Sequence, residues 1–87
     1  MIFQDRVALI TGGGTGIGKA TAERLVALGA NIIINGRREE VLARAAAQID
    51  ESRRKVITIA GDIANPSTGQ RMVDAALRQF GEVEILI

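Results

Sequence analysis

Residues 7–18 read VALITGGGTGIG, and this stretch predicts how the chain begins to fold. Val7–Ile10 is an unbroken apolar run of strand length, as expected for a strand that has helices packed on both faces. The glycine-rich turn that follows leads into a segment with helical periodicity. Because a helix N-terminus offers unpaired N–H groups and a partial positive charge, this strand–turn–helix unit predicts a phosphate-binding turn. The alternative is a glycine-rich turn without a ligand.

Strand-like and helix-like segments alternate along the rest of the chain. Further apolar runs of strand length lie at residues 32–34, 56–60 and 83–87. Helical segments are expected at residues 17–28, 38–52 and 66–80. This alternation predicts an α/β fold, a Rossmann-type doubly wound parallel sheet with about four strands and three helices. A complete sheet of this type takes roughly 150 to 180 residues, so we interpret residues 1–87 as the N-terminal part of a single domain.

Each predicted helix carries an apolar stripe that should face the sheet. We expect these stripes to consist of Ile17, Thr21, Leu25 and Leu28 in the first helix, of Leu42, Ala45, Ala46 and Ile49 in the second, and of Met72, Val73, Ala76, Leu77 and Phe80 in the third. Gly29 and Gly81 should end the first and third helices. Asn65 and Pro66 are suited to begin the third.

Composition excludes several classes of function. The 87 residues carry 11 Lys and Arg against 10 Asp and Glu, a net charge of +1, which argues against a nucleic-acid partner. The sequence has no Cys and no His, so we expect no disulfide and no metal site. The apolar runs are too short to cross a membrane. We therefore expect a soluble cytoplasmic protein.

Three phosphate-binding patterns can be compared with the glycine-rich turn. The general dinucleotide pattern G-x-G-x-x-G fails in either register, because Ile17 or Lys19 stands where its third glycine should be. The triphosphate loop G-x-x-x-x-G-K-[ST] fits Gly13, Gly18 and Lys19 and then fails at Ala20, which leaves it as a minor alternative. The third pattern, T-G-x-x-x-G-I-G, fits residues 11–18 without adjustment.

With this third pattern the chain resembles the short-chain dehydrogenase/reductase family. The resemblance also takes in Gly61-Asp62-Ile63 after the third strand and the closing run GEVEILI at residues 81–87. It implies that Gly12, Gly16 and Gly18, together with Thr15, form the turn around a cofactor pyrophosphate. Ile17 would contribute its N–H group and a side chain near the nicotinamide.

The resemblance implies an adenine site as well, in which Asp62 hydrogen-bonds the adenine amino group and Ile63 packs against the ring. A solvated loop carboxylate is the alternative for Asp62. Dinucleotide folds that bind NAD place an acid at the end of the second strand, where it would repel a 2′-phosphate. Here that position is Gly36, and Arg37 and Arg38 follow it. Arginine binds phosphate oxygens in a fork geometry, so we expect the cofactor NADP, with Arg37 as the main contact. Alternatively, both arginines are solvated and pair with Glu39 or Glu40.

The residues that would catalyse the reaction are absent. The resemblance implies a Ser and a Tyr-x-x-x-Lys pair, but the chain contains no Tyr. We therefore expect no catalytic residue here and interpret residues 1–87 as the cofactor-binding half of an oxidoreductase. It would transfer hydride between NADP(H) and a carbonyl, alcohol or enoyl substrate, a small molecule held by the other half. A non-catalytic nucleotide-binding or sensing module is the alternative. Because the strand ending at Ile87 would lie at an open edge, we also expect a homo-oligomer.

Overall fold

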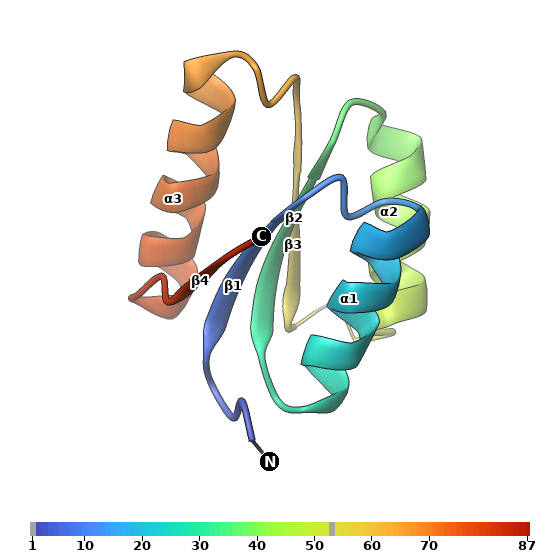
Figure 1. Ribbon diagram of the computed structural model, residues 1–87, viewed down its shortest axis with the longest axis vertical. Coiled ribbons are helices and arrows are strands. Elements are labelled where there is room, and N and C mark those ends of the chain that lie inside the picture. Colours follow the sequence, from blue (N-terminus) through green and yellow to red (C-terminus); the bar gives the residue numbers. More distant parts are fainter. Residues whose placement is uncertain (1, 53) are drawn as a thin grey trace.

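The computed structural model describes residues 2–52 and 54–87. Strands and helices alternate along this part of the chain, as predicted (Figure 1). They are β1 (Val7–Thr11), α1 (Gly16–Ala27), β2 (Asn31–Gly36), α2 (Glu39–Ile49), β3 (Val56–Ala60), α3 (Pro66–Phe80) and β4 (Ile85–Leu86). None of the helices in these two ranges is long and apolar enough to cross a membrane.

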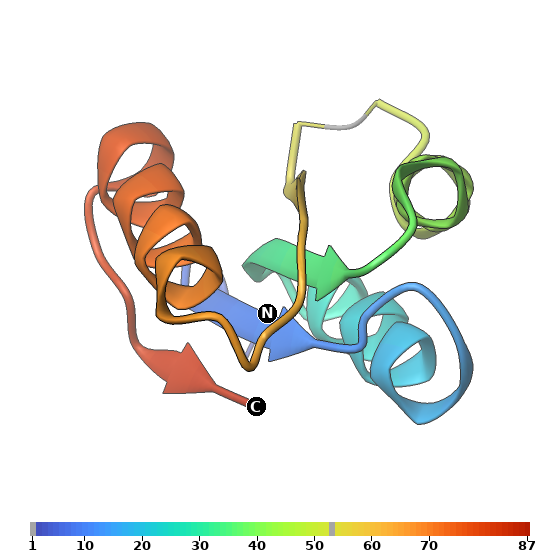
Figure 2. The ribbon, with the colours of Figure 1, turned by 90° about the horizontal axis from the view of Figure 1, so that it is seen from above.

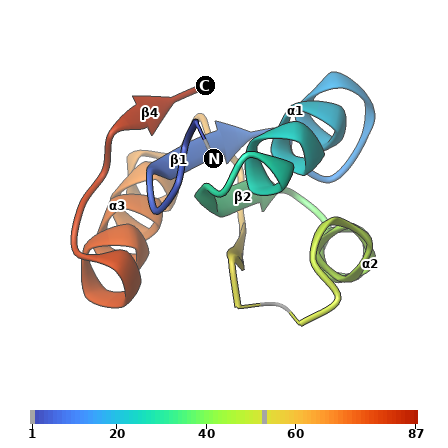
Figure 3. The same ribbon diagram turned by 90° about the horizontal axis from the view of Figure 1, so that it is seen from below.

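The strands form one parallel sheet with the order β3-β2-β1-β4. Helices α1 and α2 cover one face of the sheet and α3 covers the other (Figures 2 and 3). This is the doubly wound arrangement expected for a Rossmann-type fold, so the predicted fold class is confirmed. All three strand-to-helix connections lie at the carboxyl edge of the sheet, the upper edge in Figure 1.

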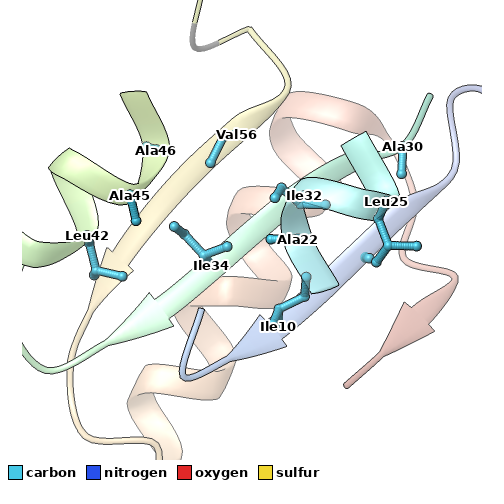
Figure 4. Close-up of a cluster of buried hydrophobic side chains, with 11 residues drawn as sticks. Ile10, Ala22, Leu25, Ala30, Ile32, Ile34, Leu42, Ala45, Ala46 and Val56 are labelled. Carbon is cyan, nitrogen blue, oxygen red and sulfur yellow. The ribbon is translucent and has the colours of Figure 1, made fainter. Parts of the chain in front are cut away.

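Side chains that alternate in direction along the strands form one hydrophobic core on each face of the sheet. Ala8, Ile10, Ile32 and Ile34 point toward α1 and α2, where they pack with Leu42 and other buried side chains (Figure 4). The intervening residues Val7, Leu9 and Ile33 point toward α3 and pack with its Met72, Ala75 and Ala76. Successive strand side chains face opposite sides, so each continuous apolar run supplies both cores.

The predicted strand boundaries differ from the observed ones at β2 and β4. Strand β2 extends beyond the apolar residues 32–34, because Asn31 and Asn35 stand in register with β1 and Gly36 with β3. Strand β4 is shorter than the predicted residues 83–87. Ile85 and Leu86 are in register with β1, and Ile87 continues the contact, since its N–H donates to the carbonyl of Leu9 at 2.9 Å and its carbonyl accepts from the N–H of Thr11 at 3.1 Å. The N–H of Glu84, just before this strand, donates to the carbonyl of Val7 at 3.0 Å and so holds the preceding segment against β1.

Helix α2 ends at Ile49 rather than at Ser52, because Asp50 builds a turn. The carboxylate of Asp50 accepts hydrogen bonds from the N–H groups of Ser52 and Lys55, at 3.2 and 3.0 Å. Partial burial raises the pKa of Asp50, but these hydrogen bonds outweigh burial and hold the pKa below its ordinary value. The chain is thereby turned toward β3.

Two predicted core positions were wrong. Ile17 is 87% exposed and Leu77 is 51% exposed, whereas Ala22 in α1 and Ala75 in α3 are buried. Helical periodicity defines an apolar stripe about 100° wide, and the residues at its margin are buried only where the sheet extends beneath them. In both helices, alanines belong to the buried core instead, together with Leu25 in α1 and Met72 in α3.

Candidate functional site

A pocket of about 450 Å³ lies at the carboxyl edge of the sheet, between the segments that follow β1, β2 and β3. Six of the nine residues predicted as a binding site line it: Gly12, Thr15, Arg37, Arg38, Asp62 and Ile63. The other lining residues are Gly14, Asn35, Gly36, Val41, Leu42 and Gly61. The remaining three predicted residues, Gly16, Ile17 and Gly18, form the first turn of α1, directly after Thr15. Ligands of open α/β sheets bind in crevices at this edge.

The backbone of the glycine-rich turn depends on glycine at several positions. Gly12 and Gly16 have φ angles of +66° and +56°, a region that residues with a Cβ rarely adopt. An added Cβ would meet no atom within 4 Å at either position, so the space beside both is open. Gly18 is different, because its Cβ would lie 2.1 Å from the carbonyl oxygen of Gly12. Glycine at this position therefore lets α1 approach the end of β1 closely.

The N-terminus of α1 leaves donors available beside the pocket. Thr15 is the N-cap, and its side chain makes no capping hydrogen bond. The first intrahelical bond runs from the N–H of Lys19 to the carbonyl of Thr15. The N–H groups of Gly16, Ile17 and Gly18 precede it and are the unpaired donors of the first turn. Such a turn suits a phosphate.

Lys19 points away from this turn. Its ammonium group donates to the side-chain carbonyl of Gln48 in α2 and so joins the two helices. A triphosphate loop needs this lysine on the phosphates. The geometry therefore disfavours the triphosphate alternative.

Asn35 organises the pocket, although this role was not predicted from the sequence. Its side chain is buried, and its amide nitrogen donates to the carbonyls of Ile59 and Gly61, both at 3.0 Å. The backbone carbonyl of Asn35 accepts from the N–H of Gly13 at 2.9 Å. One residue at the end of β2 thus holds both the glycine-rich turn and the end of β3. A polar residue directly after the apolar run at residues 32–34 was the signal that could have revealed it.

Gly36 occupies the position at which NAD-binding folds carry an acid. This position is uncharged, and there is little room for a side chain. A Cβ on Gly36 would lie 3.1 Å from Cδ2 of Leu42. The N–H of Gly61 donates to the carbonyl of Gly36 at 2.9 Å. Gly36 therefore joins the ends of β2 and β3 and leaves the pocket wall without a carboxylate at this point.

Both arginines that follow Gly36 have an acidic partner. The guanidinium of Arg37 lies 3.4 Å from the carboxylate of Asp62, with side-chain exposures of 77% and 50%. The guanidinium of Arg38 lies 3.5 Å from the carboxylate of Glu40, so the predicted alternative of a pair at the helix start holds for this residue. Asp62 also accepts from the N–H of Ala64 at 2.9 Å, which fixes the turn before α3.

A second pocket, of about 540 Å³, lies between α3 and the ends of β1 and β4. Its wall is largely apolar and includes Leu9, Met72, Val73, Val83 and Ile87. Ile63 lines both pockets. In the two described ranges, no three His, Cys, Asp or Glu side chains gather as a metal site would require.

Comparison with known proteins identifies relatives of the chain. The family model described as short chain dehydrogenase matches residues 6–87. The L-rhamnose-1-dehydrogenase of Scheffersomyces stipitis is 37% identical, over 99% of this chain and 35% of its own length. The peroxisomal 2,4-dienoyl-CoA reductase of Danio rerio is 40% identical, over 99% of this chain and 29% of its own.

A solved structure is similar to this chain in both sequence and fold. The C-domain of a bacterial malonyl-CoA reductase with NADP superimposes with a TM-score of 0.91 at 36% identity. The match covers 98% of this chain and 14% of that one. The chain therefore spans about a third of the length of the two enzymes named above and less of the solved one.

Proposed function

The chain belongs to the short-chain dehydrogenase family over residues 6–87, and on this premise we propose that it is the cofactor-binding part of an NADP(H)-dependent oxidoreductase. Residues 1–87 then form the N-terminal part of one NAD(P)-binding domain, and the catalytic residues belong to a further part of the protein. The names of the two curated relatives refer to a sugar and to an acyl-CoA. The proposal is therefore limited to hydride transfer with a carbonyl, alcohol or enoyl substrate.

The observation that carries the cofactor choice is the charge pattern at the end of β2. Gly36 stands where an acid would select NAD, and two arginines that follow it line the pocket. The side chain of Arg37 is 77% exposed, so its guanidinium can turn toward a ligand at little cost in desolvation. The solved relative that contains NADP supports the same choice.

The residues present fit a dinucleotide. The open space beside Gly12 and Gly16 allows a pyrophosphate to reach the free N–H groups of α1. Thr15 adds a hydroxyl that the helix does not use. Asp62 would accept from the adenine amino group, and Ile63, 49% exposed, offers an apolar surface to the ring.

When bound, the cofactor would donate or accept the hydride. This chain's own residues hold and orient the dinucleotide. Arg37 would bind the 2′-phosphate, the turn at Gly12–Gly18 would bind the pyrophosphate, and Ile17 would extend its exposed side chain toward the nicotinamide end. The proton that accompanies the hydride needs a donor from outside residues 1–87.

Replacing the arginine tests this proposal. One charge-assisted contact to the 2′-phosphate is worth about 1.5 to 3 kcal/mol, so the intact protein should prefer NADPH over NADH roughly 10- to 150-fold. Arg37→Ala should weaken NADPH binding by most of this factor and leave NADH nearly unchanged. Nicotinamide fluorescence during titration measures both affinities. Arg78→Ala, in the last turn of α3, is the matched control. Equal losses for both cofactors would refute the role of Arg37.

A further inference from the structure

The ion pair between Arg37 and Asp62 joins two parts of the pocket that recognise different parts of the cofactor. Arg37 follows β2 and is assigned to the 2′-phosphate, whereas Asp62 follows β3 and is assigned to the adenine. We propose that Asp62 is a specificity-determining residue that lowers the preference for NADP(H), because its carboxylate competes with the 2′-phosphate for the guanidinium of Arg37. This inference rests on the proposed function, and it adds a residue that weakens the preference for NADP(H).

The geometry of the pair favours competition over positioning. It consists of a single contact of 3.4 Å between one guanidinium nitrogen and one carboxylate oxygen. A bidentate pair would fix the orientation of the guanidinium, but one long contact on a side chain that is 77% exposed orients it weakly. The negative charge of Asp62 acts on an incoming phosphate whatever the orientation of Arg37. The carboxylate therefore contributes more repulsion than orientation.

The backbone keeps this carboxylate in place. Asp62 accepts from the N–H of Ala64, and its own carbonyl accepts from the N–H of Asn65, both at 2.9 Å. The preceding Gly61 is fixed to β2 through the carbonyl of Gly36 and through the side chain of Asn35. Asp62 thus has its position set by the fold, whereas Arg37 has a long, exposed side chain. On binding of a 2′-phosphate, the arginine is the partner that moves.

Comparison with Arg38 separates this pair from an ordinary surface contact. The partner of Arg38 is Glu40, in the first turn of α2, and this glutamate does not line the pocket. The partner of Arg37 lines the same pocket as Arg37 itself. In NAD-binding dinucleotide folds a carboxylate at the end of the second strand repels the 2′-phosphate. In this chain a carboxylate with the same effect stands at the end of β3, across from Gly36.

The expected effect is small and measurable. Exposed ion pairs contribute between 0.2 and 1 kcal/mol, which corresponds to a factor of at most about five in affinity. Asp62→Asn keeps an acceptor for the N–H of Ala64 and removes the charge. It should raise the ratio of NADPH to NADH affinity by about 1.4- to five-fold. The ratio is the relevant quantity, because contacts that both cofactors make with the adenine cancel in it.

The experiment is a double-mutant cycle in the intact protein, with NADPH and NADH titrated at low and high salt. Asp62→Asn should raise the affinity ratio in the wild-type background and raise it less in the Arg37→Ala background, where only the direct repulsion between the carboxylate and the phosphate remains. High salt should reduce the rise. Asp62→Glu should retain a ratio close to that of the wild type, and Asp62→Ser repeats the test with a different uncharged acceptor. Asp74→Asn, an exposed aspartate of α3 that contacts Gln70, controls for net charge.

Several outcomes would overturn the inference. An unchanged ratio in Asp62→Asn would show that the pair has no part in cofactor choice, and a lowered ratio would show that Asp62 positions Arg37. A rise of equal size in Asp74→Asn would assign the effect to net charge. If the wild type binds neither cofactor, or if Arg37→Ala has no selective effect, the proposed function fails as well. A failure of this inference alone leaves the wild-type preference for NADPH and its loss in Arg37→Ala intact.

Discussion

Substitution of Gly18 by alanine should loosen the contact between α1 and the glycine-rich turn. The added Cβ would lie 2.1 Å from the carbonyl oxygen and 2.8 Å from the carbonyl carbon of Gly12. Because both atoms belong to the backbone, no side chain can rotate away, and the turn and the helix must separate by about 1 Å. Overpacking of this kind costs about 3 kcal/mol at the upper end of its range, and the better helix propensity of alanine returns about 1 kcal/mol. We expect a net loss of about 2 kcal/mol in the free energy of unfolding.

The matched control is the same substitution at Gly69. This glycine lies inside α3, and a Cβ there would meet no atom within 4 Å. Gly69→Ala should therefore stabilise the protein by about 0.5 to 1 kcal/mol. Urea denaturation followed by far-ultraviolet circular dichroism measures both changes, and a 2 kcal/mol loss corresponds to a midpoint lower by roughly 1 M. If Gly18→Ala matched the wild type or gained stability like Gly69→Ala, the close approach of α1 to the turn would be refuted.

Three further predictions concern the sheet and its edge. Asn35→Ala should cost about 1 to 3 kcal/mol of stability, because it leaves carbonyls of the β3 end without their donor; an unchanged urea midpoint would contradict this. Arg6 hydrogen-bonds Glu84 and lowers the pKa of that carboxyl from its ordinary 4.5, so the stabilisation is present above pH 4.5 and is lost as the pH falls through the lowered pKa. Glu84→Gln should then be less stable than the wild type at neutral pH, with the difference vanishing in acid; a difference independent of pH would refute the assignment. Residues 1–87 purified alone should self-associate through the open β4 edge, where Ile87 is 50% exposed, and a monomer by sedimentation at about 100 μM would argue against it.

The sequence predicted the fold because its signals are local. An apolar run of four residues needs cover on both faces, and a glycine-rich turn between a strand and a helix has few other uses. The bounds of β3 and α3 agree with those predicted, since Asn65 and Pro66 begin α3 and Gly81 ends it with a φ of +85°.

What the sequence could not predict depends on contacts between distant segments. The exposure of Leu77 depends on how far the sheet extends beneath α3, and helical periodicity carries no information on that. The pairing of Arg37 with Asp62 and the contacts of Asn35 with the end of β3 require strands that are adjacent in space. The arginines were expected to pair, if at all, with the glutamates next to them. That is correct for Arg38, and the partner of Arg37 comes from the next strand.

The strand order β3-β2-β1-β4 also has a consequence for the kinetics of folding. Val7 pairs with Asn31, and Ile32 with Val56, whereas Ala8 must find Ile85 near the far end of the chain. Closing that roughly three-fold longer loop costs about 1 kcal/mol more in entropy. We therefore expect β1, β2 and β3 to assemble first, while the chain is still leaving the ribosome, and β4 to dock last. The backbone amides of β4 should exchange with solvent sooner than those of β1, β2 and β3.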